Sequence, residues 1–301
     1  MNLKKCLIWF GTVIVVVFIL DILFGKMFKA YMDRYRLAGD YEMVDHLLKS
    51  ADEEIVVLGS SVALNGINTK TLADSLGVTA YNGGANGQMF PYYLTLLKAI
   101  LEQKPPRKIV LGMIPSNLSD TGIGGRYNFL APYYGEGIGD IDSRLHGGDE
   151  LERVFLQSNF YRLNRIWFRI LLYNFVTAGI QGENGFIAKP VPPEYTVRIK
   201  WEEDEVMSEE RRAEFEEFVN LCRDNGVELT VVFAPRCVDR SIGTHTVVEQ
   251  VRELSGKYGF RFYDDTFLSP FDEVDTLFYD DRHVNINGSV IYTDSIINRL
   301  R

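Results

Sequence analysis

The chain has 301 residues, of which 46% are hydrophobic and 24% are charged, so it is long enough for one large domain or two small ones. A net charge of −9 at pH 7 argues against a nucleic-acid-binding surface, because phosphate binding requires clustered Lys and Arg. Three cysteines do not form a disulfide framework. We expect Cys222 and Cys237 to be buried free thiols, although the two could pair in an oxidising compartment.

The N-terminus carries an apolar segment. Lys4 and Lys5 precede an uncharged run over residues 6–20. Asp21 interrupts this run, which then continues over residues 22–25. No small-x-small cleavage site follows, so the pattern favours an uncleaved signal anchor, a single transmembrane helix within residues 1–28. The two lysines ahead of the span predict that the N-terminus stays in the cytoplasm and that the rest of the chain is exported.

After the anchor, short apolar strands alternate with amphipathic helices. This alternation predicts an α/β fold with a mainly parallel sheet and helices on both faces. A first helix is expected over residues 30–50. The expected strands cover residues 55–58, 108–114, 227–235 and 260–265, with one more ending at residue 81, and the expected helices cover residues 68–76, 91–102, 208–225, 246–258 and 289–300.

The alternation stops between about residues 118 and 205. This stretch begins with a Gly- and Tyr-rich segment, continues with a long amphipathic, aromatic-rich helical region over residues 155–176, and ends with a proline-rich connector. We interpret it as an insertion in a domain that covers residues 29–301. Aromatic helices of this kind more often add to a core than form a lid or a substrate wall.

Polar residues follow the ends of the predicted strands, and in a parallel sheet functional sites lie at these carboxyl ends. A serine hydroxyl is a poor nucleophile until a base removes its proton, and a histidine base needs a carboxylate to orient it. The sequence supplies all three side chains, which predicts a serine hydrolase. The candidates are Ser60 and Ser61 after the first strand, the glycine-rich residues 82–87 after the second, Asn117 after the third, and Asp280, Asp281 and His283 before the last helix.

Two of these segments could stabilise the negative oxygen of a tetrahedral intermediate. A backbone N–H in a tight glycine turn and a side-chain amide are both suitable donors, and Gly87 and Asn117 offer them. Taken singly, each motif is more often structural: a serine pair is usually a turn or a cap, and an Asp-Asp-Arg-His run is usually a solvated loop. Spacing favours Asp280 as the partner of His283, and Asp281 stays an alternative.

Together the motifs resemble those of the SGNH (GDSL-like) hydrolase and acyltransferase superfamily. Residues 59–61, Gly-Ser-Ser, are similar to its nucleophile block, and residues 81–88, Tyr-Asn-Gly-Gly-Ala-Asn-Gly-Gln, to its glycine block. Asn117 matches its Asn block, and residues 280–283 match its Asp-x-x-His block. The four blocks occur in the superfamily's order over roughly residues 55–300, and the ordered set is more specific than any one block.

The resemblance implies a flavodoxin-like three-layer α/β/α sandwich, the SGNH hydrolase fold, with a catalytic triad of Ser61, Asp280 and His283. It also implies an oxyanion hole made of the backbone N–H groups of Ser61 and Gly87 and the side-chain amide of Asn117. No cofactor and no metal are expected, because the remaining histidines lack the spacing of metal ligands.

The Gly-Ser-Ser form, the anchor and the helical insertion look like the membrane-anchored, cell-envelope O-acetylation branches of the superfamily. The resemblance therefore implies a single-pass cell-membrane protein whose extracytoplasmic domain is a serine esterase or O-acyltransferase acting on cell-envelope polysaccharide. Its substrate would be an acylated carbohydrate or another acyl donor, and a membrane-bound acyltransferase could be its partner. An alternative is a non-catalytic SGNH-like accessory protein that binds glycan or a membrane acyltransferase partner.

Overall fold

The chain folds into two compact units. One contains residues 1–42 and 127–180, and the other contains residues 43–126 and 181–301. The domain boundary expected from the sequence lies between residues 28 and 29. The computed structural model describes residues 2–34, 40–119, 127–164, 166–176, 183–194, 198–199, 204–239 and 245–301.

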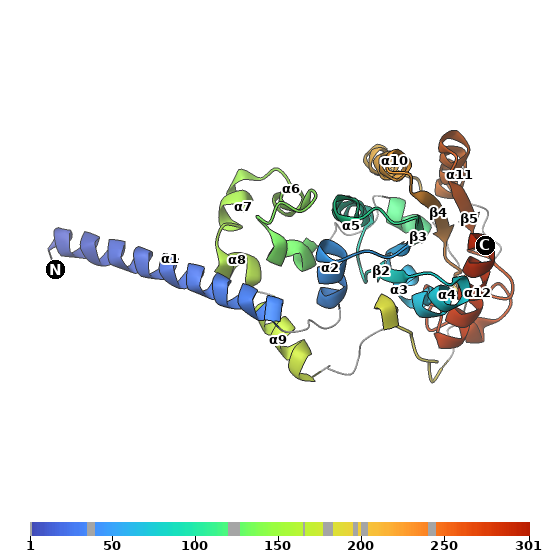
Figure 1. Cartoon of the computed structure of the whole chain (residues 1–301), viewed down its shortest axis with the longest axis horizontal. Helices are drawn as coiled ribbons and strands as arrows, with labels where there is room; N and C mark the ends of the chain where they lie inside the picture. Colours follow the sequence, from blue (N-terminus) through green and yellow to red (C-terminus); the bar gives the residue numbers. More distant parts are fainter. Residues whose placement is uncertain are drawn as a thin grey trace. The chain divides into compact units, whose positions relative to one another are not determined.

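The second unit is built on a five-stranded sheet in which every pair of neighbouring strands is parallel (Figure 1). The strand order is β2-β1-β3-β4-β5, so the first strand lies between the second and the third. The predicted parallel α/β fold is therefore confirmed. The strands are β1 (Ile55–Gly59), β2 (Ala80–Gly84), β3 (Lys108–Met113), β4 (Glu228–Phe233) and β5 (Arg261–Asp264).

Helices cover both faces of this sheet, which gives three layers (Figure 1). On one face, alternate residues of the strands form a continuous core with the three helices α3, α4 and α12. On the other, Phe90 packs against Phe215 and Phe218, which joins the helices α5 and α10. The helices of this unit are α2 (Asp40–Lys49), whose first three residues belong to the other unit, α3 (Ser61–Gly66), α4 (Thr69–Leu76), α5 (Phe90–Gln103), α10 (Glu209–Asp224), α11 (Thr246–Tyr258) and α12 (Ile286–Leu300).

Local sequence signals explain where these helices begin and end. The Ser208 side chain accepts a hydrogen bond from the backbone N–H of Arg211 and caps α10, as the sequence predicts. Helix α12 begins at Ile286, three residues earlier than expected, because the side chain of Asn285 caps it. Helix α3 was not expected. Cys222 and Cys237 are buried free thiols, in line with the favoured interpretation.

The first unit joins a long N-terminal helix to part of the predicted insertion. Helix α1 runs from Leu3 to Arg34, so residues 30–34 extend the apolar helix instead of starting a new one. The single helical region expected over residues 155–176 is divided, because Ser158 caps a new helix by accepting a hydrogen bond from the N–H of Tyr161. The other elements are η2 (Tyr127–Tyr133), α6 (Ile141–His146), α7 (Glu150–Phe155), α8 (Asn159–Leu163) and α9 (Trp167–Val176).

Candidate active site

A tight turn at the end of β1 places Ser61 at the start of helix α3. Gly59 has a φ of 139°, and a Cβ atom there would overlap the carbonyl oxygen of Gly112 on β3, so only glycine fits. The backbone N–H of Ser60 donates to that same oxygen at 3.1 Å. Ser60 is buried and Ser61 is partly exposed, so the turn presents the second serine of the pair.

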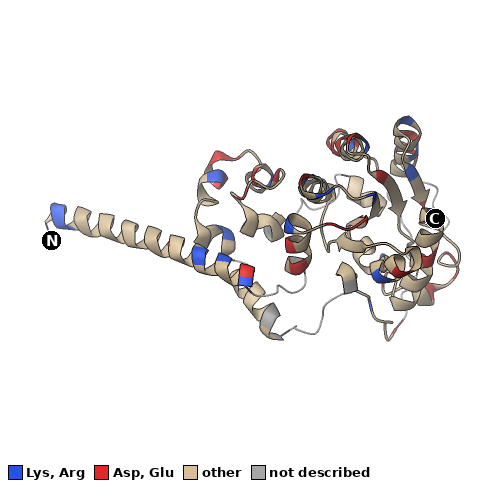
Figure 2. Cartoon of the chain, in the orientation of Figure 1, with Lys and Arg blue, Asp and Glu red and all other residues tan. Residues whose placement is uncertain are grey.

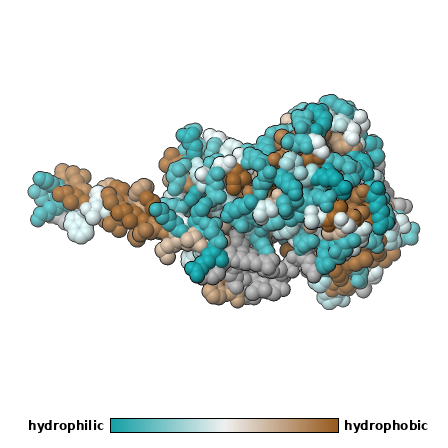
Figure 3. Space-filling model, in the orientation of Figure 1, coloured by the Kyte–Doolittle hydropathy of each residue, from teal (hydrophilic) through white to brown (hydrophobic). Residues whose placement is uncertain are grey.

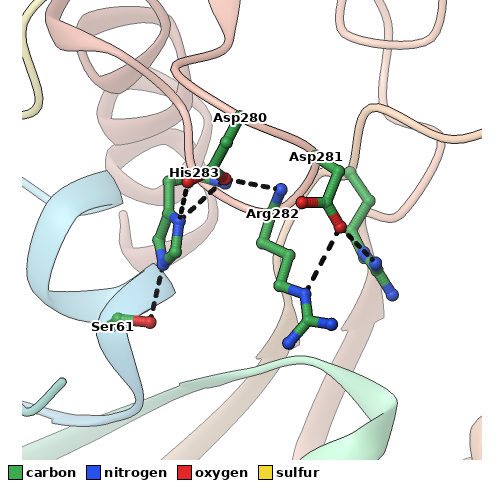
Figure 4. Close-up of polar contacts among 6 residues, drawn as sticks. Ser61, Asp280, Asp281, Arg282 and His283 are labelled. Atoms are coloured by element: carbon green, nitrogen blue, oxygen red, sulfur yellow. Dashed lines mark hydrogen bonds and ion pairs between the residues drawn. The ribbon is translucent and has the colours of Figure 1, made fainter. Parts of the chain in front are cut away.

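The structure brings Ser61, His283 and Asp280 together. The Nε2 atom of His283 lies 2.7 Å from Oγ of Ser61. On the other side of the same ring, Nδ1 lies 2.8 Å and 2.9 Å from the two carboxylate oxygens of Asp280 (Figure 4). A carboxylate that accepts from Nδ1–H leaves Nε2 as the acceptor for a serine proton. His283, oriented by Asp280, can therefore take a proton from Ser61.

The carboxylate of Asp280 is ionised and held by several donors. Burial raises its pKa, but hydrogen bonds from the His283 ring and from the backbone N–H groups of Arg282 and His283 outweigh that effect and lower the pKa to about 2. The group is thus fully charged at neutral pH.

The neighbouring carboxylate, Asp281, has different partners. Its Oδ2 lies 3.3 Å from Nη2 of Arg236, a buried residue that follows β4, and 3.3 Å from Nε of Arg282 (Figure 4). Asp280 therefore contacts the histidine, whereas Asp281 joins the turn to the segment that follows β4. Arg236 is not among the residues predicted for the site, because no sequence spacing connects it to the Asp-Asp-Arg-His run.

Asn285 holds the His283 turn in place. It is fully buried, and its Nδ2 donates to the carbonyl oxygens of Thr276 and Phe278 at 2.8 Å and 3.1 Å. Its Oδ1 accepts from the first N–H groups of α12. One side chain thus fastens both ends of the turn to the last helix. The sequence signal was an asparagine directly before an amphipathic helix, two residues after the histidine.

Asn82 holds the helix that begins at Ser61 in place. This fully buried side chain donates from Nδ2 to the carbonyl oxygens of Ala63 and Ile67, at 2.9 Å and 2.8 Å, and accepts from the N–H of Gly84. A Cβ atom at Gly84 would lie 2.5 Å from the backbone nitrogen of Leu64, so the glycine allows helix α3 to approach β2. From the sequence, Asn82 is predicted only to be part of the glycine-rich loop over residues 82–87.

The two remaining predicted residues follow the strands that flank β1. Gly87 is exposed after β2, with a φ of 66°, and Asn117 is buried in a 3-10 turn after β3, in η1 (Pro115–Leu118). The Oδ1 atom of Asn117 accepts from the N–H of Ile114 at 3.0 Å, which leaves its Nδ2 as a donor. Within the described part of the chain, neither residue is hydrogen-bonded to Ser61 or His283.

Among the residues that the structure describes, no group of three or more His, Cys, Asp or Glu side chains is placed to hold an ion. The serine, imidazole and carboxylate brought together here can supply nucleophilic attack, proton transfer and stabilisation of an imidazolium.

No protein-family model and no curated protein matches the chain. Several solved structures are similar to it. One is a provisionally assigned acylhydrolase from Bacteroides fragilis NCTC 9343, with 12% sequence identity and a TM-score of 0.43, over 89% of this chain and 96% of that chain. Another is a lipase/acylhydrolase from Enterococcus faecalis, with 11% identity and a TM-score of 0.40, over 82% and 95%.

A third similar structure is a GDSL-like lipase from Bacteroides thetaiotaomicron VPI-5482, with 8% identity and a TM-score of 0.41, over 82% of this chain and 86% of that chain. All three similarities are distant.

Proposed function

We propose that this chain is an exported, membrane-anchored serine esterase or O-acyltransferase that acts on acylated cell-envelope polysaccharide. The observation that carries the proposal is the pair of contacts on the His283 ring: Nε2 lies 2.7 Å from Oγ of Ser61, and Nδ1 lies 2.8 Å from Oδ1 of Asp280. A nucleophile, a base and a carboxylate that orients the base are the working parts of acyl transfer through serine.

In the first half of the proposed reaction, Ser61 takes the acyl group. Its Oγ attacks the carbonyl carbon of the ester while its proton passes to Nε2 of His283. The ester C–O bond then breaks, and the imidazolium returns the proton to the departing alcohol. Asp280 stabilises the imidazolium because its low pKa keeps it charged throughout.

In the second half, the acceptor removes the acyl group from Ser61. Water or a sugar hydroxyl gives its proton to His283 and attacks the acyl carbonyl, and Oγ leaves as the proton returns to it. Water as acceptor makes the chain an esterase, and a sugar hydroxyl makes it an O-acyltransferase. The same residues serve both outcomes, since only the attacking oxygen differs.

The oxyanion formed in each half needs donors in fixed positions. The backbone N–H of Ser61 at the start of α3, the N–H of Gly87 and the Nδ2 of Asn117 are the proposed donors. Support comes from the sheet order, which places the segments after β2 and β3 on either side of β1. Support for Asn117 also comes from its bond to Ile114, which fixes the amide and leaves Nδ2 as a donor.

The proposed location rests on helix α1. It is 32 residues long, its most apolar window has a mean hydropathy of 2.7, and 6% of that window is buried. Such a helix is long enough to cross a membrane. Lys4 and Lys5 lie at its start, and a long stretch without charge, residues 6–20, follows them (Figure 2). A membrane-bound acyltransferase that delivers the acyl group is the partner proposed from the superfamily resemblance.

Covalent labelling of the purified full-length protein with a fluorophosphonate tests the proposal. We expect the label on Ser61, and we expect Ser61→Ala to abolish it. Ser75→Ala, which removes an exposed hydroxyl on α4, is the matched control and should label normally. A folded wild-type protein that takes no label and hydrolyses no acetyl ester would instead support the non-catalytic accessory role. Release of free acetate, compared with its transfer to an added oligosaccharide, separates esterase from transferase.

A further inference from the structure

Helices α7, α8 and α9 of the first unit expose aromatic side chains to solvent, although other residues of these segments are buried. Leu163 and Ile170 are buried, whereas Phe168 is 61% exposed and Phe175 is 82% exposed. Phe168, Leu172 and Phe175 are spaced along one stripe of α9. We call the exposed aromatic side chains of these helices the aromatic face; they are Phe155, Phe160, Tyr161, Trp167, Phe168 and Phe175.

The aromatic face is joined to helix α1 at a defined point. The ring of Phe24 on α1 stacks on Phe160, with centroids 4.8 Å apart, and meets Trp167 edge-on at 6.4 Å. A side chain at Gly25 would overlap Asn159, so a glycine at this position allows α8 to approach α1 closely (Figure 1). The apolar surface of α1 therefore continues into the aromatic face.

Asp21 secures the same contact. Its carboxylate accepts hydrogen bonds from Oγ of Ser158 at 2.8 Å, from the backbone and side chain of Asn159 at 3.0 Å and 3.1 Å, and from the N–H of Phe160 at 2.7 Å. The charge that interrupts the apolar run is thus buried and fully bonded, and it satisfies N–H groups at the start of α8 that no helix bond can reach. Helix α8 is held at one level along α1.

The length of the apolar segment indicates where that level would lie in a bilayer. A helix rises about 1.5 Å per residue, so the segment from Cys6 to Phe24 covers about 27 Å, close to the hydrocarbon thickness of about 30 Å. The side chains along this segment, from Leu7 to Leu23, are largely exposed and apolar, and Figure 3 shows them as a hydrophobic band on α1. If this segment spans the membrane, α8 meets it where the hydrocarbon ends.

We propose that the aromatic face is a membrane-interface surface that rests in the outer edge of the bilayer beside the α1 anchor. Lipid is the occupant that the observations favour, because the face is continuous with an apolar helix of spanning length and contains Trp, Tyr and Phe. Trp and Tyr concentrate at membrane–water interfaces, and Phe is common on the apolar side of helices that lie in the interface. The proposal goes beyond the catalytic function and rests on the proposed anchor.

The surface gives the first unit a second attachment to the membrane besides the α1 span. Short helices with exposed Phe, Trp and Leu side chains bind in the plane of the interface, and their binding grows with the apolar area that enters it. With both α1 and α8 attached, the first unit is restrained against tilting relative to the bilayer.

Depth-dependent fluorescence quenching in the full-length protein tests the proposal. Trp9→Phe and Trp201→Phe leave Trp167 as the fluorophore, and the protein is reconstituted into phosphatidylcholine vesicles that contain lipids brominated close to the headgroup or deep in the chain. We expect the shallow label to quench Trp167 more strongly than the deep label. The matched control adds Val15→Trp and Trp167→Phe, which should reverse the order because residue 15 lies in the middle of the span.

The outcomes separate the inference from the anchor on which it rests. Quenching of the residue 15 probe without quenching of Trp167 would overturn the membrane-interface surface and leave the anchor intact. In that case, protection of Trp167 from aqueous iodide would identify a protein or a second copy of the chain as the occupant. Quenching of neither probe would overturn the anchor as well, while fluorophosphonate labelling of Ser61 would still report on the proposed chemistry.

A pair of glycine substitutions tests whether the α1–α8 contact sets the depth. Gly25→Leu introduces a side chain that must displace Asn159, and we expect it to change the ratio of shallow to deep quenching of Trp167. Gly11→Leu is the control, because a Cβ atom there meets nothing within 4 Å. An unchanged ratio in a folded Gly25→Leu protein would contradict the proposed registration of α8 on α1.

Discussion

Nε2 of His283 lies 2.7 Å from Oγ of Ser61, although the two residues are 222 positions apart in the chain. One residue begins the helix after the first strand, and the other lies in the turn before the last helix. Buried asparagines hold the two segments in place. Asn82 donates to the carbonyl oxygen of Ala63 in helix α3, and Asn285 donates to that of Thr276, ahead of the His283 turn. The contact is therefore a product of the folded sheet and its two flanking segments.

Removal of the proposed nucleophile or base should abolish turnover. We expect Ser61→Ala and His283→Ala each to lower kcat by a factor on the order of 10⁴ to 10⁶, because the residues of a triad act as a unit. Ser60→Ala should cost far less, since its side chain is buried in the turn and Ser61 Oγ is the atom that contacts His283. Acetyl-ester hydrolysis by the three purified variants is the measurement. An inactive Ser60→Ala protein beside an active Ser61→Ala protein would refute the assignment.

The two neighbouring aspartates should differ in effect. Asp280→Asn replaces the acceptor for Nδ1–H of His283 and should lower kcat strongly while leaving the fold intact. Asp281→Asn weakens contacts to Arg236 and Arg282 and should reduce activity only mildly. Kinetics and circular dichroism of the two variants, measured side by side, provide the comparison. An equal or larger loss at Asp281 would show that the wrong carboxylate has been assigned.

Asn117 should act on the transition state through its amide N–H groups. Asn117→Asp keeps an oxygen to accept from Ile114 but removes the donors on Nδ2 and adds a negative charge. We expect kcat to fall by about 100- to 1,000-fold, with little change in KM, as for the loss of an oxyanion-hole donor. Asn225→Asp, at the exposed end of α10, is the matched control. Full activity in the Asn117→Asp protein would remove this residue from the proposed site.

Acid should remove the contribution that Asp280 makes to the free energy of unfolding. The pKa of this group is about 2 in the folded chain against an ordinary value of 3.8, so its stabilisation is present when the pH is well above 3.8 and is lost as the pH falls through that value toward 2. We expect wild-type protein to lose more stability than Asp280→Asn over this window. Urea unfolding in detergent at several pH values measures the difference between the two proteins. A difference that does not change with pH would contradict the lowered pKa.

Much of the fold could be read from local signals. The alternation of apolar strands and amphipathic helices predicts the parallel sheet, and the Ser208 cap predicts the start of helix α10. These features depend on residues that are close in sequence, where hydrophobic period and capping chemistry act directly. The division of residues 155–176 was missed, because Ser158 begins a new helix inside a run of continuous helical periodicity.

The sequence by itself determined the types of chemistry present: a serine after a strand, an Asp-x-x-His run before the last helix, and an apolar N-terminal segment. The tertiary structure decided which carboxylate contacts His283, since Asp280 and Asp281 are adjacent in sequence but the backbone of the turn directs them to different partners. It also decided that Asp21, an interruption in the apolar run, accepts hydrogen bonds from residues 158–160. Such pairings depend on where distant segments meet, and packing of the whole chain sets those positions.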